Sequence, residues 1–541
     1  MKKRICIALL AVIAAAAPAM AQSGTYAKRV LSQIDKIGRA LILINNNYVD
    51  TIQVEKMSDS ILKEMLHTLD PHSEYIPAED VDEANEHLLG SFSGVGIEFA
   101  LISDTITVQR VIPGGPSEKV GIMAGDRFIR IDTTLVAGVG IKTEAVRRML
   151  RGEKDTKVTV SVLRRGSDAP SDYTITRGKV PLNSLETAYA PEPGVMYIKL
   201  STFAAYSALE IYNAFKYHFS ESIPTGVILD LRDNGGGYLN VAISIANMFL
   251  DAGQRVVYTE GAHVGFKDEI LENRGFYLDR PLVVLVNENS ASSSEIVAGA
   301  LQDWDRGIII GRRTFGKGLV QRLYTLDDGS QIRLTVARYH TPTGRVIQSP
   351  YEEGKRREYY TSKSSLGNSD LPPDSLRFET LVQHRTVYGG GGILPDIIIP
   401  RDTSYITGYL NDMVRTGIYP DFINGYCDTM RTAIKPLSPD YDTFCEVFDS
   451  QCAEEAIATL EAYAASRGLE PVPEEMERSK HYLITRTKAQ LARHLFGDEG
   501  YWRVFNSTFD PEFEKALEVI RNWPSRFPDH AADHAAEQAA D

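Results

Sequence analysis

A serine-rich turn is the first stretch of this sequence whose residue types could do chemistry. In NENSASSSEIVAGALQDW, residues 287–304, serines stand at positions 290, 292, 293 and 294, between an apolar run and a helical pattern. One such residue is enough to cap a helix. Ser292, however, falls within the turn, where its hydroxyl can be exposed beside the free N–H groups of a helix start. That position suits a nucleophile whose tetrahedral intermediate carries an oxyanion.

A serine hydroxyl needs a base, and the candidate base is a lysine. Lys317 stands between Gly316 and Gly318 in RRTFGKGLVQRLYTL, directly after the apolar run GIIIG. Burial would lower the pKa of this lysine and allow its neutral amine to take the proton of Ser292. Gln321 follows four residues later, on the same side of an extended segment, and could orient the amine.

A glycine turn could supply the oxyanion donors. Residues 233–237, DNGGG, follow the apolar run GVILDLR and lack the spacing of a phosphate-binding or dinucleotide-binding loop. A nucleotide-binding domain would rest on Gly235 to Gly237 alone, so a backbone N–H donor is the better interpretation. Each feature also has a simpler explanation, namely a helix cap, a solvated lysine and an ordinary turn. Their order on successive strands favours the catalytic explanation.

The segments that must position these residues alternate between strands and helices. Apolar strand patterns and helical patterns alternate over residues 195–345, which predicts an α/β layer with a mostly parallel sheet. Short alternating strands punctuated by glycine predict a small β-rich domain, and residues 350–390 are expected to form a long loop. The predicted divisions are a signal peptide (1–21), an N-terminal helical region (22–90), the β-rich domain (91–178), the α/β core (179–400), a C-terminal helical region (401–527) and a disordered tail (528–541).

Composition restricts the class of protein. A chain of 541 residues is long enough for three or four domains, and 43% apolar with 24% charged residues is ordinary for soluble globular domains. The net charge of −14 argues against nucleic acid or an anionic membrane as the main partner. No spacing of cysteine and histidine predicts a zinc site.

The first residues have the pattern of a secretory signal. Lys2, Lys3 and Arg4 precede an apolar run that is too short to span a bilayer, and Ala19-Met20-Ala21 forms a small-x-small cleavage site. We expect cleavage near Ala21 and export to the periplasm, with an uncleaved anchor as the alternative.

Three cysteines remain after that cleavage: Cys427, Cys445 and Cys452. An exported protein can form one disulfide from them, with one thiol left over. If residues 442–452 form one helix, Cys445 and Cys452 lie roughly 10 Å apart along its axis, which exceeds disulfide reach. We therefore expect Cys427 to pair with one of the other two.

The motifs resemble those of the C-terminal processing (tail-specific) peptidase family, which are Ser/Lys endoproteases. The run from Ser290 to Glu295 matches the family's S-A-S-x-S-E, and the run from Gly316 to Gln321 matches its G-K-G-x-V-Q. The resemblance implies Ser292 as nucleophile, Lys317 as base and Gln321 as the partner of that base. It also implies that the N–H groups of Ser293 and Gly236 form the oxyanion hole.

The resemblance covers roughly residues 25–400, including LDPHSEYI, in which His72 is expected to be only a surface or turn-packing residue. Within it, the β-rich domain looks like a PDZ module, whose carboxylate loop would be Gly94, Val95, Gly96 and Ile97. PDZ domains add a C-terminal peptide to a sheet edge. Ser293 and Gly235 stand where the family has alanine and proline, and the region after residue 402 matches no part of the family pattern.

The implied fold is multidomain α/β: a crotonase/ClpP-like protease core with an inserted PDZ domain and helical regions at both ends. The implied function is an exported serine endopeptidase that selects protein substrates by their C-terminal tails, without metal, nucleotide or other cofactor. A homodimer, an adaptor protein and gating of the site by the PDZ domain are further expectations. The rival is a catalytically silent PDZ scaffold, against which the intact Ser292, Lys317 and Gln321 speak.

Overall fold

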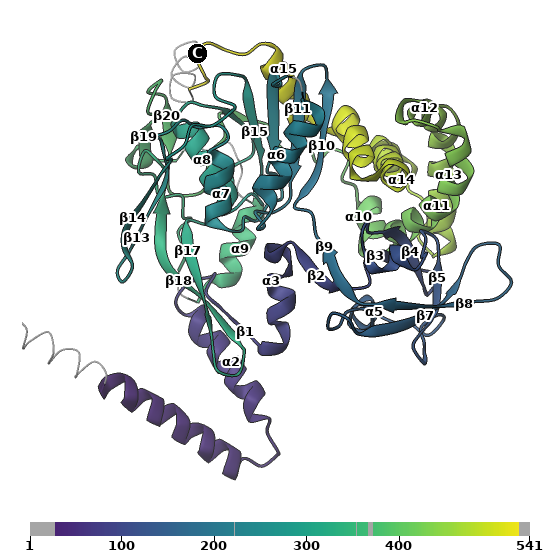
Figure 1. Ribbon diagram of the computed structural model, residues 1–541, viewed down its shortest axis with the longest axis horizontal. Helices are drawn as coiled ribbons and strands as arrows, with labels where there is room; N and C mark the ends of the chain where they lie inside the picture. The colour runs from purple at the N-terminus through teal and green to yellow at the C-terminus, as the bar shows by residue number, and fades with distance from the viewer. Residues whose placement is uncertain (1–27, 221, 353, 366–371, 530–541) are drawn as a thin grey trace, which may run out of the picture.

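The computed structural model describes residues 28–220, 222–352, 354–365 and 372–529. The predicted signal peptide, and the predicted tail beyond Asp529, lie outside these residues. Figure 1 shows an α/β body, a β-rich lobe and a helical lobe beside it, and a single N-terminal helix that projects away from all three. None of the helices in the described ranges combines the length and the apolar composition that a membrane crossing requires.

The α/β body contains a six-stranded sheet in the order β10-β11-β12-β15-β16-β21. Its strands run parallel except for β10 at the edge. Every residue of β11, β12, β15 and β16 is buried, as parallel strands covered on both faces require. The strands are β10 (Leu185–Glu192), β11 (Val195–Leu200), β12 (Gly226–Asp230), β15 (Leu282–Val286), β16 (Ile308–Gly311) and β21 (Ile397–Ile398).

Helices cover the two faces of this sheet, and the hydrophobic core lies on both sides of it. Side chains of α6, α7 and α8 pack on one face, whereas those of α15 pack on the other (Figure 1). These helices are α6 (Ser207–His218), α7 (Leu239–Ala246), α8 (Ser293–Asp303) and α15 (Pro511–Arg521). The predicted α/β layer is confirmed.

A second, antiparallel sheet stands against the body and carries the segment after Lys317. Its order is β1-β18-β13-β14, with β17 also paired to β18. Its shortest strand, β1, comes from the N-terminal region and pairs with β18, so that region is joined to this sheet. The strands are β1 (Glu74–Ile76), β13 (Arg255–Gly261), β14 (Gly265–Ile270), β17 (Leu319–Thr325) and β18 (Gln331–His340).

The β-rich lobe has its own apolar core and is attached by a two-stranded stalk. The stalk strands pair antiparallel, with Ser91 opposite Pro181, so the lobe is an insertion. Its main sheet has the order β3-β4-β5-β7-β8, which leaves β3 at an edge. The elements are β2 (Ser91–Gly94), β3 (Ile97–Ile102), β4 (Thr105–Val111), α4 (Pro116–Lys119), β5 (Arg127–Ile131), β6 (Thr134–Leu135), α5 (Thr143–Leu150), β7 (Lys157–Leu163), β8 (Ser171–Thr176) and β9 (Gly178–Pro181).

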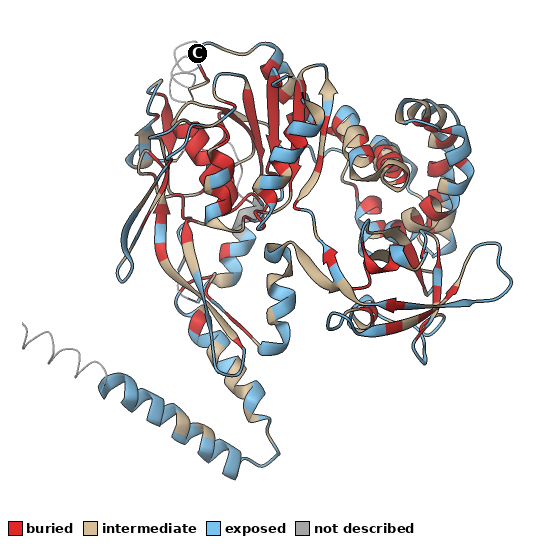
Figure 2. Ribbon diagram, viewed as in Figure 1, coloured by how far each residue is buried: buried red, intermediate tan, exposed pale blue. Residues whose placement is uncertain are grey.

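The N-terminal region is helical, as predicted. A helix over residues 28–47 is exposed along almost its whole length (Figure 2). It is followed by α2 (Val54–His67), the 3₁₀ turn η1 (Ala78–Asp80) and α3 (Val81–Leu89).

The C-terminal region is a helical lobe that bridges the β-rich lobe and the α/β body. Arg110 and Arg127 of the β-rich lobe form ion pairs with Asp498 (3.0 Å) and Asp428 (3.5 Å). The longest helix, α14, has a kink at Gly497, whose φ of 73° is not helical. The elements are α10 (Gly408–Arg415), α11 (Ile418–Ile434), η3 (Lys435–Leu437), α12 (Tyr441–Val447), η4 (Phe448–Cys452), α13 (Ala453–Ser466) and α14 (Pro473–Phe509).

The long loop predicted over residues 350–390 is wrong. This stretch contains the helix α9 (Arg356–Ser365), the turn η2 (Asp374–Leu376) and a hairpin of β19 (Arg377–Glu379) with β20 (Thr386–Tyr388). The sequence of α9 is too polar to show a helical period. Its fold is fixed by tertiary contacts instead, because Tyr359 is buried among aromatic rings.

The predicted disulfide is also wrong, since all three cysteines in the described ranges are free thiols. Cys427 and Cys452 are buried in one apolar cluster, and burial raises the pKa of the Cys427 thiol well above its usual value. A thiol that resists ionisation in this way is a poor partner for disulfide exchange. The expected single helix over residues 442–452 is α12 followed by one wider π turn.

Candidate active site

Ser292 lies in the turn between β15 and α8, as its sequence position predicts. Its backbone has φ 55° and ψ −112°, an uncommon conformation for a residue with a side chain. Strained backbone of this kind is typical of a nucleophile held on a sharp turn from strand to helix. Two hydrogen bonds join the turn to the segment after β12. Ser290 Oγ donates to the carbonyl of Leu231 (2.8 Å), and Ala291 N donates to the carbonyl of Asn234 (3.0 Å).

A buried glutamate joins this turn to the lysine segment. Glu295 Oε2 accepts from the backbone N–H groups of Ser292 (2.9 Å) and Lys317 (2.8 Å). Its Oε1 accepts from Gly316 N (2.7 Å) and from Thr314 Oγ1 (2.6 Å). A carboxylate has about four acceptor positions, so Glu295 is fully used as a clamp. Burial raises the pKa of Glu295, although these four hydrogen bonds oppose the increase.

The sequence motif did not predict the role of Glu295, which stands in it only as the last residue. The signal was present, because serine followed three residues later by glutamate is a capping box. Tyr339, on β18, was missed as well. Its hydroxyl donates to the carbonyl of Lys317 and lies 3.2 Å from the carbonyl of Ser292. No local pattern in the sequence could have indicated that contact.

Lys317 and Gln321 are brought together, as predicted. Lys317 Nζ donates to Gln321 Oε1 at 2.9 Å, and Gln321 Nε2 donates to the carbonyl of His72 at 2.6 Å. Burial lowers the pKa of Lys317, and the neighbouring charge of Arg333 lowers it further, while Glu295 and two other acids act in the opposite direction. The amine is therefore closer to neutral at physiological pH than an exposed lysine.

The Lys317 amine does not contact the hydroxyl of Ser292 through a hydrogen bond in this structure, as far as the described residues go. The amine donates to Gln321 Oε1. The two side chains are nevertheless held in one site, since Glu295 binds the backbone of both residues. Catalytic contacts in an enzyme without substrate are often longer than in the reacting complex.

The two predicted oxyanion donors flank Ser292. Ser293 is the first residue of α8, so its N–H has no partner within the helix. Gly236 has φ 99°, and a Cβ there would lie 2.8 Å from both the Ala291 carbonyl and Ser292 Cβ, so only glycine fits. Its N–H donates to Asn234 Oδ1 at 2.9 Å and must leave that acceptor before it can bind an oxyanion.

A buried charge cluster holds the strand that leads to this glycine turn. Arg232 forms ion pairs with Asp230 (2.6 Å), Asp510 (2.7 Å) and Glu512 (2.7 Å). Burial alone would raise the pKa of Asp230, but the charges of Arg232 and Lys199 hold it well below its usual value. The C-terminal helices are thereby fixed to the strand that positions Gly236.

The predicted carboxylate loop, Gly94 to Ile97, lines a cavity of about 120 Å³ in the β-rich lobe. The cavity lies between β3, which is an edge strand, and α5. Apolar side chains and two arginines complete it: Phe92, Phe99, Leu150, Arg147 and Arg151. An extended peptide with a free carboxylate is the kind of ligand that such a groove accepts.

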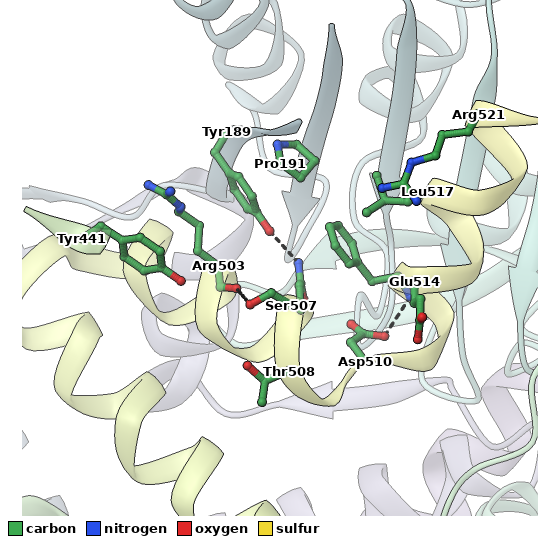
Figure 3. Close-up of a pocket in the computed structure, with 12 residues that line it drawn as sticks. Tyr189, Pro191, Tyr441, Arg503, Ser507, Thr508, Asp510, Glu514, Leu517 and Arg521 are labelled. Carbon is green, nitrogen blue, oxygen red and sulfur yellow. Dashed lines mark hydrogen bonds between the residues drawn. The ribbon is translucent and has the colours of Figure 1, made fainter. Parts of the chain in front are cut away.

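A larger cavity of about 450 Å³ lies where the C-terminal helices meet β10, and it contains none of the predicted site residues. Figure 3 shows Tyr441 and Arg503 on one side of it and Leu517 and Arg521 on the other. The described residues contain no group of three or more His, Cys, Asp or Glu side chains arranged to hold a metal ion.

Comparison with known proteins agrees with this geometry. The sequence model of Peptidase family S41 matches residues 194–352, that of the PDZ domain matches residues 93–172, and that of a family of unknown function (DUF8443) matches residues 409–497. The carboxy-terminal-processing protease of Bartonella bacilliformis is 35% identical over 366 residues, which are 65% of this chain and 83% of that protein. The carboxyl-terminal-processing protease of Synechocystis sp. is 38% identical over 52% of this chain and 66% of that protein.

Among solved structures, a photosystem II D1 C-terminal processing protease is 31% identical over 57% of this chain and 89% of that chain, with a TM-score of 0.32. The extent and identity of the match to the Bartonella protein, together with the two family models, define the chain. It is a serine peptidase with a PDZ domain, and it belongs to peptidase family S41, the family of the carboxy-terminal-processing proteases.

Proposed function

We propose that this chain is an exported endopeptidase that cleaves peptide bonds by a Ser/Lys mechanism and selects its substrates by their C-terminal tails. The observation that carries the proposal is the shared carboxylate of Glu295. It binds the N–H of Ser292 and those of Gly316 and Lys317, so the nucleophile turn and the lysine segment form one unit.

In the proposed reaction, the neutral amine of Lys317 leaves Gln321 Oε1 and takes the proton of Ser292 Oγ. The oxygen then attacks the peptide carbonyl, and the resulting oxyanion is held by the N–H groups of Ser293 and Gly236. Lys317 returns the proton to the departing amine, which leaves an ester on Ser292. Water, deprotonated by the same amine, hydrolyses that ester and releases the second product.

The PDZ groove supports tail selection. Its edge strand β3 can pair with the last residues of a substrate, while the cavity between β3 and α5 takes the terminal side chain and carboxylate. The insertion of this domain between the N-terminal region and the catalytic sheet also supports gating of the site. If the gate exists, deletion of residues 94–178 will change the cleavage of tailed and untailed substrates; unchanged cleavage of both would exclude it.

Export to the periplasm is supported by the signal pattern in residues 1–21. It is tested by sequencing the N-terminus of protein recovered from the producing cells, with Gln22 as the expected first residue. The proposed partners are protein substrates, a second copy of this chain and an adaptor protein. Nucleic acid is not proposed as a partner.

The first experiment compares the chain from Gln22 with its Ser292→Ala and Lys317→Ala variants. Each is incubated with an unfolded model protein at several pH values, and fragments are read by mass spectrometry. Cleavage by the parent alone supports the Ser/Lys mechanism. Equal cleavage by all three would mean another nucleophile. If none of the three cleaves, two alternatives are left, a tail-binding PDZ scaffold and a protease that requires a partner, and the binding of a C-terminal peptide to the PDZ groove is measured next by fluorescence titration.

A further inference from the structure

The orientation of the Gln321 side-chain amide is set by a distant part of the chain. Gln321 Nε2 donates to the backbone carbonyl of His72 at 2.6 Å, and Gln321 Oε1 accepts from Lys317 Nζ at 2.9 Å. A carbonyl oxygen can only accept a hydrogen bond. The NH₂ end of the amide must therefore face His72, and only then does its oxygen face the lysine.

The opposite orientation would disable the base. If the amide turned over, its NH₂ group would face Lys317. That group would repel the ammonium form of the lysine, and it would donate to the lone pair of the neutral amine. The lone pair is what must accept the proton of Ser292, so the His72 carbonyl decides whether Lys317 can act as a base.

The His72 carbonyl is held in place by the carboxylate of Asp70, which is only 6% exposed. Asp70 Oδ1 accepts from the backbone N–H groups of His72 (2.8 Å) and Ser73 (2.7 Å), and its Oδ2 accepts from Ser73 Oγ (2.6 Å). Within the described ranges Asp70 forms no ion pair with a lysine or arginine, so its hydrogen bonds all serve this turn.

Two further contacts fix the turn to the body. Ser73 Oγ accepts from the N–H of Thr335 on β18 (3.1 Å), and β1 pairs with β18 directly after it. On the other side, the His72 ring lies between the hydroxyls of Tyr359 (3.1 Å) and Tyr360 (3.3 Å) of α9. The turn is thus held between two elements that do not carry the nucleophile.

We propose that Asp70 is a positioning residue of the reaction: through the turn from Asp70 to Ser73 it holds the His72 carbonyl against Gln321, and so keeps the oxygen of that amide on Lys317. The role rests on the Ser/Lys mechanism proposed above. Asp70 has a second, electrostatic action, because its charge is among those that raise the pKa of Lys317.

The test is a double-mutant cycle on the chain from Gln22, using Asp70→Ala, Gln321→Ala and the double variant, with kcat and KM measured on one peptide. Asp70→Ala is expected to lower kcat roughly 10–100-fold with little change in KM, because the PDZ groove is untouched. If Asp70 acts through Gln321, the double variant is no slower than Gln321→Ala alone. A double variant that loses the product of both single losses would overturn the proposal.

Two matched variants separate positioning from folding. In Asp70→Asn the amide oxygen can still accept from His72 N and Ser73 N, so kcat stays within a few-fold of the parent. The rising limb of its pH profile moves to lower pH, because a negative charge near Lys317 is lost. Ser73→Ala keeps both backbone contacts of Asp70 but loses the contacts of Ser73 Oγ, so its loss of kcat is expected to be smaller than that of Asp70→Ala. A loss in Ser73→Ala as large as in Asp70→Ala contradicts the positioning role, and an unmoved limb in Asp70→Asn contradicts the electrostatic action.

Lys317→Ala is the control for the mechanism on which the proposal rests. If Lys317→Ala is as active as the parent, the Ser/Lys mechanism fails and the role of Asp70 fails with it. If Lys317→Ala is inactive but the double variant loses the product of the Asp70→Ala and Gln321→Ala losses in kcat, only the role of Asp70 is overturned. Thermal unfolding of each variant, followed by circular dichroism, shows which activity losses come from unfolding.

Discussion

At the scale of single residues, the ionisation of Lys317 should govern the pH dependence of the enzyme. Its pKa is lowered by burial and by Arg333, and the amine is a base only when neutral. We therefore expect kcat/KM to rise with pH and to level off below the ordinary lysine pKa of 10.5. Arg333→Gln removes a neighbouring positive charge, so the pKa rises and the limb moves to higher pH. A shift to lower pH in this variant, measured on the same peptide, contradicts the assignment of the limb to Lys317.

The glycine turn offers a matched pair of substitutions. Gly236→Ala places a methyl group 2.8 Å from the Ala291 carbonyl and from Ser292 Cβ, at a φ of 99°. Loss of an oxyanion donor or displacement of the nucleophile costs about 100-fold or more in kcat. Gly235→Ala should be close to neutral, because nothing lies within 4 Å of its added methyl. Equal kcat values for the two variants would remove Gly236 from the site.

The sequence predicted the residues that have local signatures. Ser292 stands where a strand pattern changes to a helix pattern. Lys317 stands between two glycines, and Gln321 follows four residues later. It could not predict the contacts of Tyr339 or His72, because their partners lie far along the chain and no periodic pattern records them. The engagement of the Gly236 N–H with Asn234 was equally hidden, since it depends on the exact path of the turn.

At the scale of elements, the Glu295 clamp should stabilise the start of α8 and the segment before β17 together. Glu295→Gln keeps the shape, but its NH₂ group must face either the N–H groups of Ser292 and Lys317 or the N–H of Gly316, and an N–H group cannot accept a hydrogen bond. Each buried donor left unsatisfied costs about 1–3 kcal/mol, so we expect a loss of roughly 2–5 kcal/mol in unfolding free energy, measured by urea denaturation. Glu446→Gln, on an exposed site of α12, is the control and should change it by less than ~0.5 kcal/mol.

Elements with strong apolar patterns were predicted well, and elements held by distant contacts were not. The strands β12, β15 and β16 are continuous apolar runs, which can only be buried in a covered sheet. The polar helix α9 has no such pattern, and it is held by Tyr359 and Tyr360 against His72 and Phe315.

At the scale of the whole molecule, the projecting helix over residues 28–47 should be a dimer contact. Val30, Ile34, Ile37, Leu41 and Ile44 follow alternating steps of four and three, the spacing of a coiled-coil seam. Ile34 and Ile37 are 59% and 44% exposed, which is unusual for large apolar side chains on one helix face.

We expect the chain from Gln22 to sediment as a dimer. The double variant Ile34→Glu/Ile37→Glu should sediment as a monomer, because charge on the seam cannot be buried there. Lys36→Glu, off the seam, should leave the dimer intact. A parent that is monomeric at all concentrations in analytical ultracentrifugation contradicts this contact.

The order of the domains along the chain could be predicted, but their contacts could not. The sequence after residue 402 matched no part of the peptidase pattern, yet Asp510 and Glu512 form ion pairs with Arg232, which lies between the strand β12 and the glycine turn. Ion pairs between segments so far apart leave no signal in local composition, since charged residues are common on every helix surface.

The ion pair between Arg232 and Asp510 also has a consequence for when a newly made chain can become active. Arg232 and Asp510 are separated by 278 residues, and a ribosome adds about 5–20 residues per second. Each growing chain carries both its serine turn and its lysine only from Lys317 onward, so the face of the sheet that α15 covers is bare for roughly 10–40 s, until Asp510 has been added. A chain in this unfinished state lacks the segment that fixes the oxyanion strand, so we expect it to become a competent peptidase only after Asp510 has been synthesised.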